Sequence, residues 1–384
     1  MTEERKAPAI RFKEFSGQNA EAWEQRKLGE VADITMGQSP KSENYTDNPS
    51  NYILVQGNAD MKDGKVFPRV WTTQVTKQGR VGDLILSVRA PVGDIGKTDY
   101  NVVLGRGVAA IRGNEFIFQT LSKMNQNGYW NKLSTGSTFE SINSNDIKSA
   151  TILIPSSPEQ KAIGSFFQEL DQLITLQQRK LEKSRRIKIA MLQKMFPENE
   201  QTVPAIRFKE FSGQNAKVWE LRKLEECTEI SAGGDIDKSK LLNNGKYPVI
   251  ANALTDDGII GYYNDSYRIE APAVTVTGRG NVGVAKARNV NFTPVVRLLS
   301  LRSDYDVIFL ENAINTKNIV IESTGVPQLT VPQLGSYKIF LPSLPEQRAI
   351  GSFFQELDQL IILQQRRLDK LQNMKKALLE QMMM

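Results

Sequence analysis

Two long stretches of the chain place hydrophobic residues at three- and four-residue steps, which is the spacing of an amphipathic helix. In the first stretch, residues 157–196, Glu, Gln, Lys and Arg occupy the opposite face. We expect Ser157 to be its N-cap and Gln160 to complete a capping box. At 1.5 Å per residue, about 39 residues would form a helix roughly 58 Å long. The apolar face consists of Ile163, Phe166, Phe167, Leu170, Leu173, Ile174 and Leu181.

The second stretch, residues 344–384, repeats the first, with four differences between residues 158–183 and residues 345–370. Either helix alone would expose its apolar face to water, at a cost of about 1.5–3 kcal/mol per large side chain. The chain leaves one domain along the first helix and returns along the second, which predicts an antiparallel pair. The alternative is two separate helices, each packed on its own domain. The matching apolar residues are Ile350, Phe353, Phe354, Leu357, Leu360 and Ile361.

A second repeat lies upstream of each predicted helix. Residues 8–28, PAIRFKEFSGQNAEAWEQRKL, recur almost unchanged as residues 204–224. The chain therefore consists of a repeated segment, a variable domain and a long helix, followed by the same three parts. We expect a pseudo-two-fold, near-circular arrangement in which the termini meet and the helices form a coiled-coil spacer. The predicted divisions are a first domain over residues 1–155, a helix over 156–197, a second domain over 198–342 and a helix over 343–384.

The two variable domains have diverged from each other, although both read as mixtures of short strands and short helices. Runs rich in Val, Ile and Leu, such as residues 83–88 and 273–277, are bounded by glycine-containing turns. Short helices are predicted near residues 116–125 and 307–315. The fold class is therefore α+β, with two paralogous α/β domains. A protein that recognises two different target sequences would keep the repeated segments and helices nearly identical and vary the two domains in this way.

The composition favours an acidic partner and excludes several kinds of active site. The 384 residues carry a net charge of +6, which makes nucleic acid the first candidate. The chain has no histidine and one cysteine, Cys227, which removes Ser-His and Cys-His nucleophiles and the usual zinc sites. A single cysteine suits a reducing cytoplasm. The polar N-terminus and the lack of a long apolar run predict no secretory signal and no membrane span.

No catalytic motif emerges from the sequence. Residues 92–98 approach a phosphate-binding loop, but Pro91 stands where the first glycine is needed. We therefore predict that the chain is not an enzyme by itself. One alternative is a cytosolic enzyme with duplicated domains that uses carboxylates such as Asp83 and Asp94, and another is a structural coiled-coil adaptor. Adjacent acids in turns are more often solvated than catalytic.

Glycine-containing loops in the two domains are the best candidates for nucleic-acid contact. Each has an arginine upstream, Arg89 or Arg279, and a lysine downstream. Glycine lets the backbone approach a phosphate, and arginine can also read guanine through two hydrogen bonds. The alternative is a hairpin turn with solvated charges. The candidate DNA-contacting residues are Gln56, Asn58, Lys62, Lys65, Arg69, Arg89 and Lys97 in the first domain, and Asn252, Tyr262, Tyr263, Arg279, Asn281, Lys286 and Arg288 in the second.

The repeated motifs resemble those of the specificity subunit of type I restriction–modification enzymes. The residues that carry the resemblance are Pro8-Ala9-Ile10-Arg11-Phe12 with Trp23, their copies at 204–208 with Trp219, and Pro158-Glu159-Gln160 with Pro345-Glu346-Gln347. The likeness implies two target-recognition domains, each reading one half of a bipartite, asymmetric site in double-stranded DNA. It also implies a helical spacer on which two adenine-methyltransferase subunits dock, joined by nuclease–translocase subunits for restriction.

The same resemblance places S-adenosylmethionine, ATP and magnesium on partner subunits and none of them on this chain. A related subunit from another type of system, or from a methylation-only complex, would share these motifs. We expect the protein to be cytoplasmic.

Overall fold

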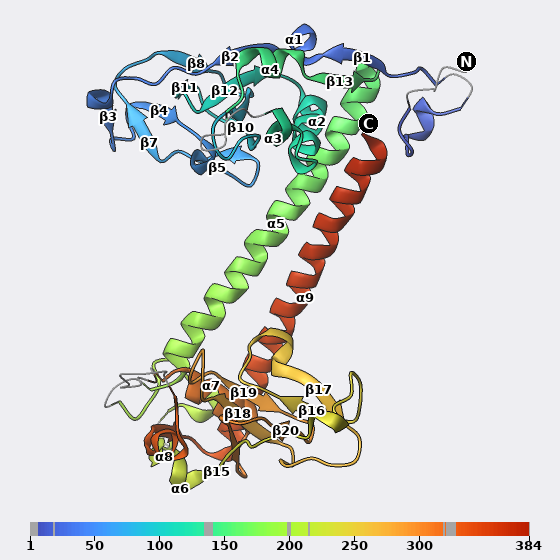
Figure 1. Ribbon diagram of the computed structural model, residues 1–384. Coiled ribbons are helices and arrows are strands. Elements are labelled where there is room, and N and C mark those ends of the chain that lie inside the picture. Colours follow the sequence, from blue (N-terminus) through green and yellow to red (C-terminus); the bar gives the residue numbers. More distant parts are fainter. Residues whose placement is uncertain are drawn as a thin grey trace. The chain divides into compact units, whose positions relative to one another are not determined.

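The computed structural model describes residues 7–17, 20–133, 141–197, 201–213, 216–317, 319 and 328–383. It divides into two compact units, Met1–Arg179 with Arg366–Met384, and Lys180–Gln365. Each unit contains one α+β domain and one end of each long helix (Figure 1). The predicted fold class is therefore confirmed.

The domain of the first unit is built on two mixed sheets. The six-stranded sheet has the order β2 (Asp33–Met36), β12 (Val108–Arg112), β9 (Leu84–Ser87), β10 (Ile95–Lys97), β6 (Lys65–Val66) and β5 (Met61–Lys62). The five-stranded sheet has the order β3 (Tyr45–Thr46), β7 (Val70–Thr72), β4 (Tyr52–Val55), β11 (Val102–Leu104) and β8 (Lys77–Gly79). A separate pair joins β1 (Glu24–Lys27) to β13 (Thr151–Ile154). The helices are α1 (Leu28–Val31), α2 (Glu115–Gln126), α3 (Tyr129–Leu133), α4 (Ser144–Ser149) and α5 (Ser157–Met195).

The domain of the second unit repeats a reduced form of this plan. Its four-stranded sheet has the order β15 (Glu229–Ala232), β21 (Leu298–Arg302), β18 (Ala273–Thr277) and β19 (Ala285–Arg288). Its three-stranded sheet has the order β17 (Ile259–Tyr263), β16 (Tyr247–Ile250) and β20 (Thr293–Pro294). A separate pair joins β14 (Glu220–Lys223) to β22 (Lys338–Leu341). The helices are α6 (Leu224–Cys227), α7 (Val307–Asn315), α8 (Val331–Ser336) and α9 (Leu344–Met382).

The central strands of both domains lie in the hydrophobic core, where Ile85 of β9 packs with Val55 of β4, and Val274 of β18 packs with Phe309 of α7. All residues of β9 and β18 are buried. In both domains the first sheet pairs these strands antiparallel to their neighbours, whereas the second sheet contains a parallel pair, β11 with β4 or β20 with β16. The polar residues of these two buried strands are Ser87, Thr275 and Thr277.

The long helices, α5 and α9, contain 39 residues each, but the capping box predicted for α5 is wrong. Ser157 is already helical, and the Gln160 side chain donates instead to the carbonyl oxygen of Pro155 at 2.9 Å. Gln347 donates in the same way to the carbonyl oxygen of Pro342 at 2.9 Å. Each glutamine therefore ties the end of a domain's last strand to the first turn of the following helix.

Polar contacts between the long helices confirm the predicted antiparallel pair. In the first unit, Asp171 of α5 forms an ion pair with Lys375 of α9 at 2.6 Å. In the second unit, the Arg185 guanidinium donates to Gln365 at 2.9 Å, and Lys188 forms an ion pair with Asp358 at 2.5 Å. Residue numbers rise along α5 while they fall along α9, so the two helices run in opposite directions.

Several residues predicted to pair the helices have other roles. Ile350 and Phe354 of α9 lie in the core of the second domain with Phe309 of α7, although the Phe354 ring also lies 6.0 Å from that of Phe196, directly after α5. The alternative expectation, packing on the helix's own domain, therefore holds for the first turns of α9. Leu173 and Leu360, predicted to lie between the helices, are 50% and 45% exposed.

The burial pattern along the helices explains why Leu173 faces water. The buried positions of α5 follow the steps Leu170, Ile174, Gln177 and Leu181, and a residue one position before Ile174 is rotated away by about 100°. Of the other predicted pairing residues, Ile163 and Phe167 are buried, and Phe166, Phe353, Leu357 and Ile361 are half-buried.

The repeated segments are anchored to the long helices by two matching ion pairs. The Arg11 guanidinium donates to both carboxylate oxygens of Glu159 at 2.6 Å, and the side chains are 9% and 0% exposed. Arg207 makes the same contact with Glu346, at 2.7 Å to each oxygen and with 7% and 1% exposure. Arginine with carboxylate in this two-bond geometry is the strongest kind of protein ion pair.

Each repeated segment also contacts the end of the other long helix in its unit. The Ile10 amide donates to the carbonyl oxygen of Gln381 at 3.0 Å, as predicted for termini that meet. In the second unit the Ile206 amide donates to Lys194 at 2.8 Å. The two segments have nearly identical sequences because they pack at two equivalent sites. Each site is made from the start of one long helix and the end of the other.

We expect the substitution Arg207→Ala to lower the free energy of unfolding by about 3–5 kcal/mol, because it leaves the buried Glu346 carboxylate without its partner. Urea unfolding followed by circular dichroism measures this change. Arg222→Ala is the matched control, since Arg222 pairs with Glu220 at the surface and its loss should cost less than about 1 kcal/mol. Equal losses in the two variants would contradict a structural role for the buried pair.

Candidate nucleic-acid interface

Three loops meet at one edge of the first domain. They are residues 56–58 after β4, 87–94 around the end of β9, and 105–107 after β11. The Gly105 amide donates to the Val55 carbonyl at 2.7 Å, and the Val88 amide donates to the Gly107 carbonyl at 2.8 Å. A Cβ at Gly107 would lie 2.0 Å from the Gln56 carbonyl oxygen, so only glycine permits this approach. We call this region the three-loop edge.

The second domain has the same three-loop edge, formed by residues 251–258, 277–284 and 295–297. The Val295 amide donates to the Ile250 carbonyl at 2.8 Å. The Asn252 side chain accepts from the Gly278 amide at 2.8 Å and donates to the Val296 carbonyl at 3.1 Å, so it joins all three loops. Asn252 was predicted to contact DNA, but this framework role occupies its amide.

The middle loop of each edge has the same hydrogen-bonded form, and we call residues 87–94 and 277–284 the arginine loops. In the first domain the Ser87 hydroxyl donates to the Pro91 carbonyl at 2.8 Å and accepts from the Asp94 amide at 2.9 Å. The Ser87 backbone accepts from the Gly93 amide at 2.9 Å, and Gly93 has a φ of 98°. This positive φ favours glycine.

In the second domain Thr277 replaces the serine and makes the same bonds. Its hydroxyl donates to the Asn281 carbonyl and accepts from the Val284 amide at 3.0 Å. Its backbone accepts from the Gly283 amide at 2.8 Å, and Gly283 has a φ of 87°. The two loops, which the sequence predicts to be counterparts, therefore have the same hydrogen-bonded structure.

Arg89 and Arg279 occupy the same position in the two arginine loops, and both are exposed. Among the residues that the structure describes, neither guanidinium has a hydrogen-bonding or ionic partner. Sequence reasoning missed two further arginines on the neighbouring loops, Arg106 and Arg297. Arg297 has a φ of 71°, which is uncommon for a residue other than glycine and often marks a functional position. The glycine pattern around residues 105–107 was the available signal for Arg106.

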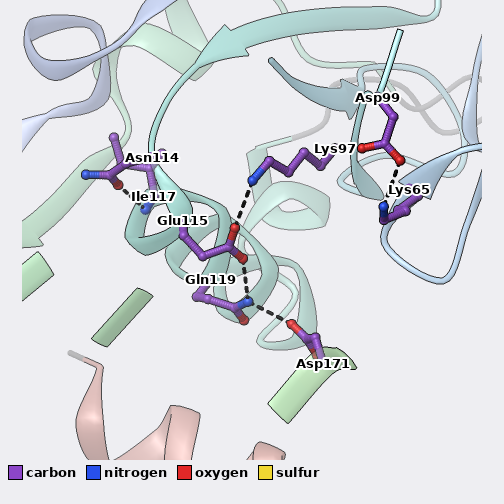
Figure 2. Close-up of polar contacts among 8 residues, drawn as sticks. All are labelled: Lys65, Lys97, Asp99, Asn114, Glu115, Ile117, Gln119 and Asp171. Carbon is purple, nitrogen blue, oxygen red and sulfur yellow. Dashed lines mark hydrogen bonds and ion pairs between the residues drawn. The ribbon is translucent and has the colours of Figure 1, made fainter. Parts of the chain in front are cut away.

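The two lysines predicted to accompany these arginines are used inside the domains instead. Figure 2 shows Lys97 donating to Glu115 of α2 at 3.1 Å, and Gln119 of the same helix donating to Asp171 of α5 at 2.8 Å. Lys286 is paired with Asp257. Both lysines lie in strands, where they connect the sheet to a neighbouring element, and their role as DNA contacts stays a prediction.

The remaining predicted contacts fall into two groups. Arg69, Lys65 and Tyr263 have partners within the first or second domain: Arg69 donates to the Ala59 carbonyl at 2.9 Å, Lys65 pairs with Asp99 at 2.7 Å (Figure 2), and the Tyr263 hydroxyl donates to the Asp237 carbonyl at 2.9 Å. Arg288 is half-buried and donates to Thr275 at 3.0 Å. The other predicted contacts are Gln56, Asn58, Lys62, Arg89, Tyr262, Arg279 and Asn281, of which Lys62, Arg89, Arg279 and Asn281 are exposed. Lys65 and Arg69 also stay exposed, at 63% and 50% of their side chains.

The contacts between domain and helix differ in charge between the two units. Glu311 of α7 takes the place that Gln119 has in α2, is largely buried, and accepts from the Ala287 amide at 2.9 Å. Burial raises the pKa of Glu311, and the nearby Asp358 raises it further, whereas Lys188 and Lys286 lower it. The first unit has no such repulsion between two carboxylates at this position, because Gln119 is neutral and donates to Asp171.

No alternative chemistry emerges from the part of the chain that the structure describes. It contains no group of three or more His, Cys, Asp or Glu residues that could hold a metal ion. Burial raises the pKa of the Cys227 thiol to about 11, so this thiol is a poor nucleophile at neutral pH. An open cavity of about 820 Å³ lies beside Cys227, but Glu225, Glu226 and Asp304 make its lining unsuited to phosphate. None of the described helices is long and apolar enough to cross a bilayer.

Residues 20–184 and 216–373 each match the family described as type I restriction modification DNA specificity domain. The chain belongs to this family. The two matches cover both domains and most of both long helices, so the repeat seen in the sequence is a repeat of the family's own domain.

Individual relatives agree with this assignment. A chain named as the MjaX type I restriction enzyme specificity subunit of Methanocaldococcus jannaschii is 32% identical over 182 residues, which is 45% of this chain and 42% of that one. The alignment therefore spans less than half of the relative's length.

Solved structures share the fold. The crystal structure of the type I restriction-modification S subunit from M. genitalium has a TM-score of 0.70 at 17% identity, covering 98% of this chain and 99% of that one. A second structure, described for complex assembly and conformational transition of the type I system, has a TM-score of 0.51 at 18% identity, with coverage of 93% and 96%. The specificity-subunit resemblance is therefore confirmed at the level of family and fold.

We expect the substitution Glu311→Gln to stabilise the protein above about pH 5, by on the order of 1 kcal/mol. The raised pKa means that the folded state binds the Glu311 proton more tightly than the unfolded state. Stability is therefore lost as the pH rises from the unfolded pKa, about 4.3, through the folded pKa. The variant should lack this loss, and urea unfolding of both proteins at several pH values measures it.

The reciprocal change, Gln119→Glu, is the matched control for this prediction. It places a second carboxylate beside Asp171 and should destabilise the first unit at neutral pH but not at acidic pH. If Glu311→Gln has the same effect at every pH, titration of Glu311 is not its cause.

Proposed function

We propose that this chain is the DNA sequence-specificity subunit of a type I restriction–modification complex and is not an enzyme by itself. Each domain reads one half of a bipartite, asymmetric site in double-stranded DNA. The observation that carries this proposal is the duplicated three-loop edge, which presents an exposed arginine from the same loop in two domains that otherwise differ. Membership of a DNA-specificity family supports it. The complex would act on DNA in the cytoplasm.

In this proposal residues 1–155 and 198–342 are the two readers, and the helices of residues 156–197 and 343–384 set the spacer. Each helix is continuous over 39 residues, which supports a helical spacer. At 1.5 Å per residue this corresponds to roughly 58 Å, and therefore to at most roughly 17 base pairs of unread DNA.

The helices also carry the surfaces that we assign to two methyltransferase subunits. In the first unit Leu173, Leu176 and Met374 are 50%, 50% and 42% exposed. The counterparts of these residues in the second unit are Leu360, Leu363 and Ile187, which are 45%, 62% and 39% exposed. Large apolar side chains exposed in the same pattern in both units suit two copies of one partner.

Restriction would require further nuclease–translocase subunits on the same complex. S-adenosylmethionine, ATP and magnesium would be bound by these partners and by the methyltransferases. A methylation-only complex, or a related system of another type, would use the same chain without the nuclease, and affinity purification from cells distinguishes these cases by the presence of a nuclease subunit.

Methylome sequencing of cells that express the chain with its cognate methyltransferase tests the proposed function directly. We expect methylation at one bipartite motif with two unlike halves. Replacing the second domain by that of another specificity subunit should change one half of the motif only. A change in both halves, or no methylation at a defined motif, would contradict the proposal.

We expect an insertion of one or two helical turns within residues 177–186 to lengthen the unread spacer without changing either half-site. The two readers would then be held farther apart, while their loops stay the same. Methylome sequencing of the insertion variant measures the spacer. A replacement of the same residues by an equally long helical sequence is the control, and an unchanged spacer in the insertion variant would refute the proposed role of the helices.

We expect the double substitution Leu176→Asp and Leu363→Asp to abolish copurification of the methyltransferase, because each charge would have to be buried without a partner. Val290→Asp is the control, since Val290 is 56% exposed and lies in the second domain outside the helices. The single substitutions should each remove one of two bound subunits, which native mass spectrometry resolves. Full binding by the double variant would exclude these surfaces.

A further inference from the structure

Resting on the DNA recognition proposed above, we infer that the arginine loops are phosphate anchors. Arg89 and Arg279 bind the DNA backbone at equivalent places in the two half-sites, independently of the base sequence. Base recognition then comes from the neighbouring loops, which differ between the domains. The proposal divides the three-loop edge into a shared part that positions DNA and a variable part that reads it.

The first reason is that arginine is the only exposed side chain that the two loops share. The loops read SVRAPVGD and TGRGNVGV, and apart from arginine they have in common only a valine and a glycine at corresponding positions. Val92 is buried, Val282 is half-buried, and the glycines have positive φ. These residues maintain the loop, whereas the arginine projects from it.

A contact common to both readers suits the part of DNA that is common to all sites. Phosphate contacts fix the register and orientation of a protein on the duplex but carry no sequence information. Two domains that read different half-sites have no reason to keep the same base contact. They do have a reason to keep the same backbone contact, because it sets how each domain meets the double helix.

The second reason is that the arginine is available for a ligand. The lysines that follow the loops, Lys97 and Lys286, are held by Glu115 and Asp257. By contrast, Arg89 and Arg279 have no carboxylate partner among the described residues. A guanidinium that is not neutralised by the protein can donate two parallel hydrogen bonds to a phosphate.

A second arginine lies beside each anchor on the neighbouring loop. In the first domain, the Val88 amide next to Arg89 donates to Gly107, the residue that follows Arg106, at 2.8 Å. In the second domain, a Cβ at Gly278 would lie 2.2 Å from the Arg297 carbonyl oxygen, so the backbones of these loops touch. The paired loops therefore bring two cations to one end of each domain.

The loops that differ are the candidates for base reading. The first domain has Gln56 and Asn58 in this place, whereas the second has the exposed Asp256 at a φ of 49°. Side-chain amides and carboxylates are the groups that distinguish adenine and cytosine in the major groove. Their difference between the domains matches a difference between two half-sites.

The test uses the complex of this chain with its methyltransferase and measures the affinity of Arg89→Ala and Arg279→Ala for two DNA duplexes. One duplex carries the cognate site, and the other has both half-sites scrambled. We expect each variant to bind both duplexes roughly tenfold more weakly. The slope of log K against log salt should fall by about 0.9 per variant, as for one lost phosphate contact. The methylated motif should remain the same.

Arg26→Ala and Arg222→Ala are matched controls, because these arginines are also exposed and equivalent in the two repeats but lie in β1 and β14. They should leave the affinity and the slope unchanged. Relaxed specificity in one half-site with an unchanged affinity for scrambled DNA would overturn the proposal in favour of base reading. Normal affinity and slope in both variants would also overturn it. If the unaltered complex shows no preference for its own site, the proposed function itself fails.

Discussion

The buried ion pairs between the repeated segments and the long helices are the constraint on which the rest of the structure depends. Arg11 with Glu159, and Arg207 with Glu346, each join a segment that precedes a domain to the helix that follows the same domain. Removing either partner would leave a charge almost without water, which is far more costly than losing a surface pair. The ion pairs therefore explain why the motifs P-A-I-R-F and P-E-Q recur together.

This frame is completed by close packing at the start of each long helix. A Cβ at Gly164 would lie 2.9 Å from the Glu115 side chain, and a Cβ at Gly351 would lie 2.3 Å from that of Asp306. The glycines thus let α5 and α9 approach the first turn of α2 and α7. Trp23 packs against Phe116 of α2 and Trp219 against Phe309 of α7, at 5.6 Å and 5.8 Å between ring centroids. Because these contacts hold each domain on its long helices, the loops of the sheets can change in sequence without unfolding the domain.

Some of the basic side chains form ion pairs within the protein, and others are exposed without a carboxylate partner. Lys97 and Lys286 form ion pairs with Glu115 and Asp257, and Lys188 and Lys375 connect α5 to α9. The net charge of +6 therefore does not describe a uniform basic surface. What matters for a nucleic-acid partner is where on each domain the cations without a carboxylate partner lie. The arginine loops supply such cations in both domains, and the same loop geometry presents them.

The sequence alone determined the two long helices, their antiparallel pairing, the duplicated plan and the family, because these features are repeated or periodic and so appear in a single chain. It also located β9, β18 and α7 to within a residue, since buried strands and amphipathic helices have strong local patterns. It did not determine which face of α5 is covered, so the prediction that Leu173 lies between the helices is wrong. It also did not determine that Lys97 and Lys286 form ion pairs with Glu115 and Asp257. Partners such as Glu115 for Lys97 are distant in sequence, and only the tertiary structure brings them together. Arg106 and Arg297 became candidates for the same reason, because their loops adjoin the arginine loops in space and not along the chain.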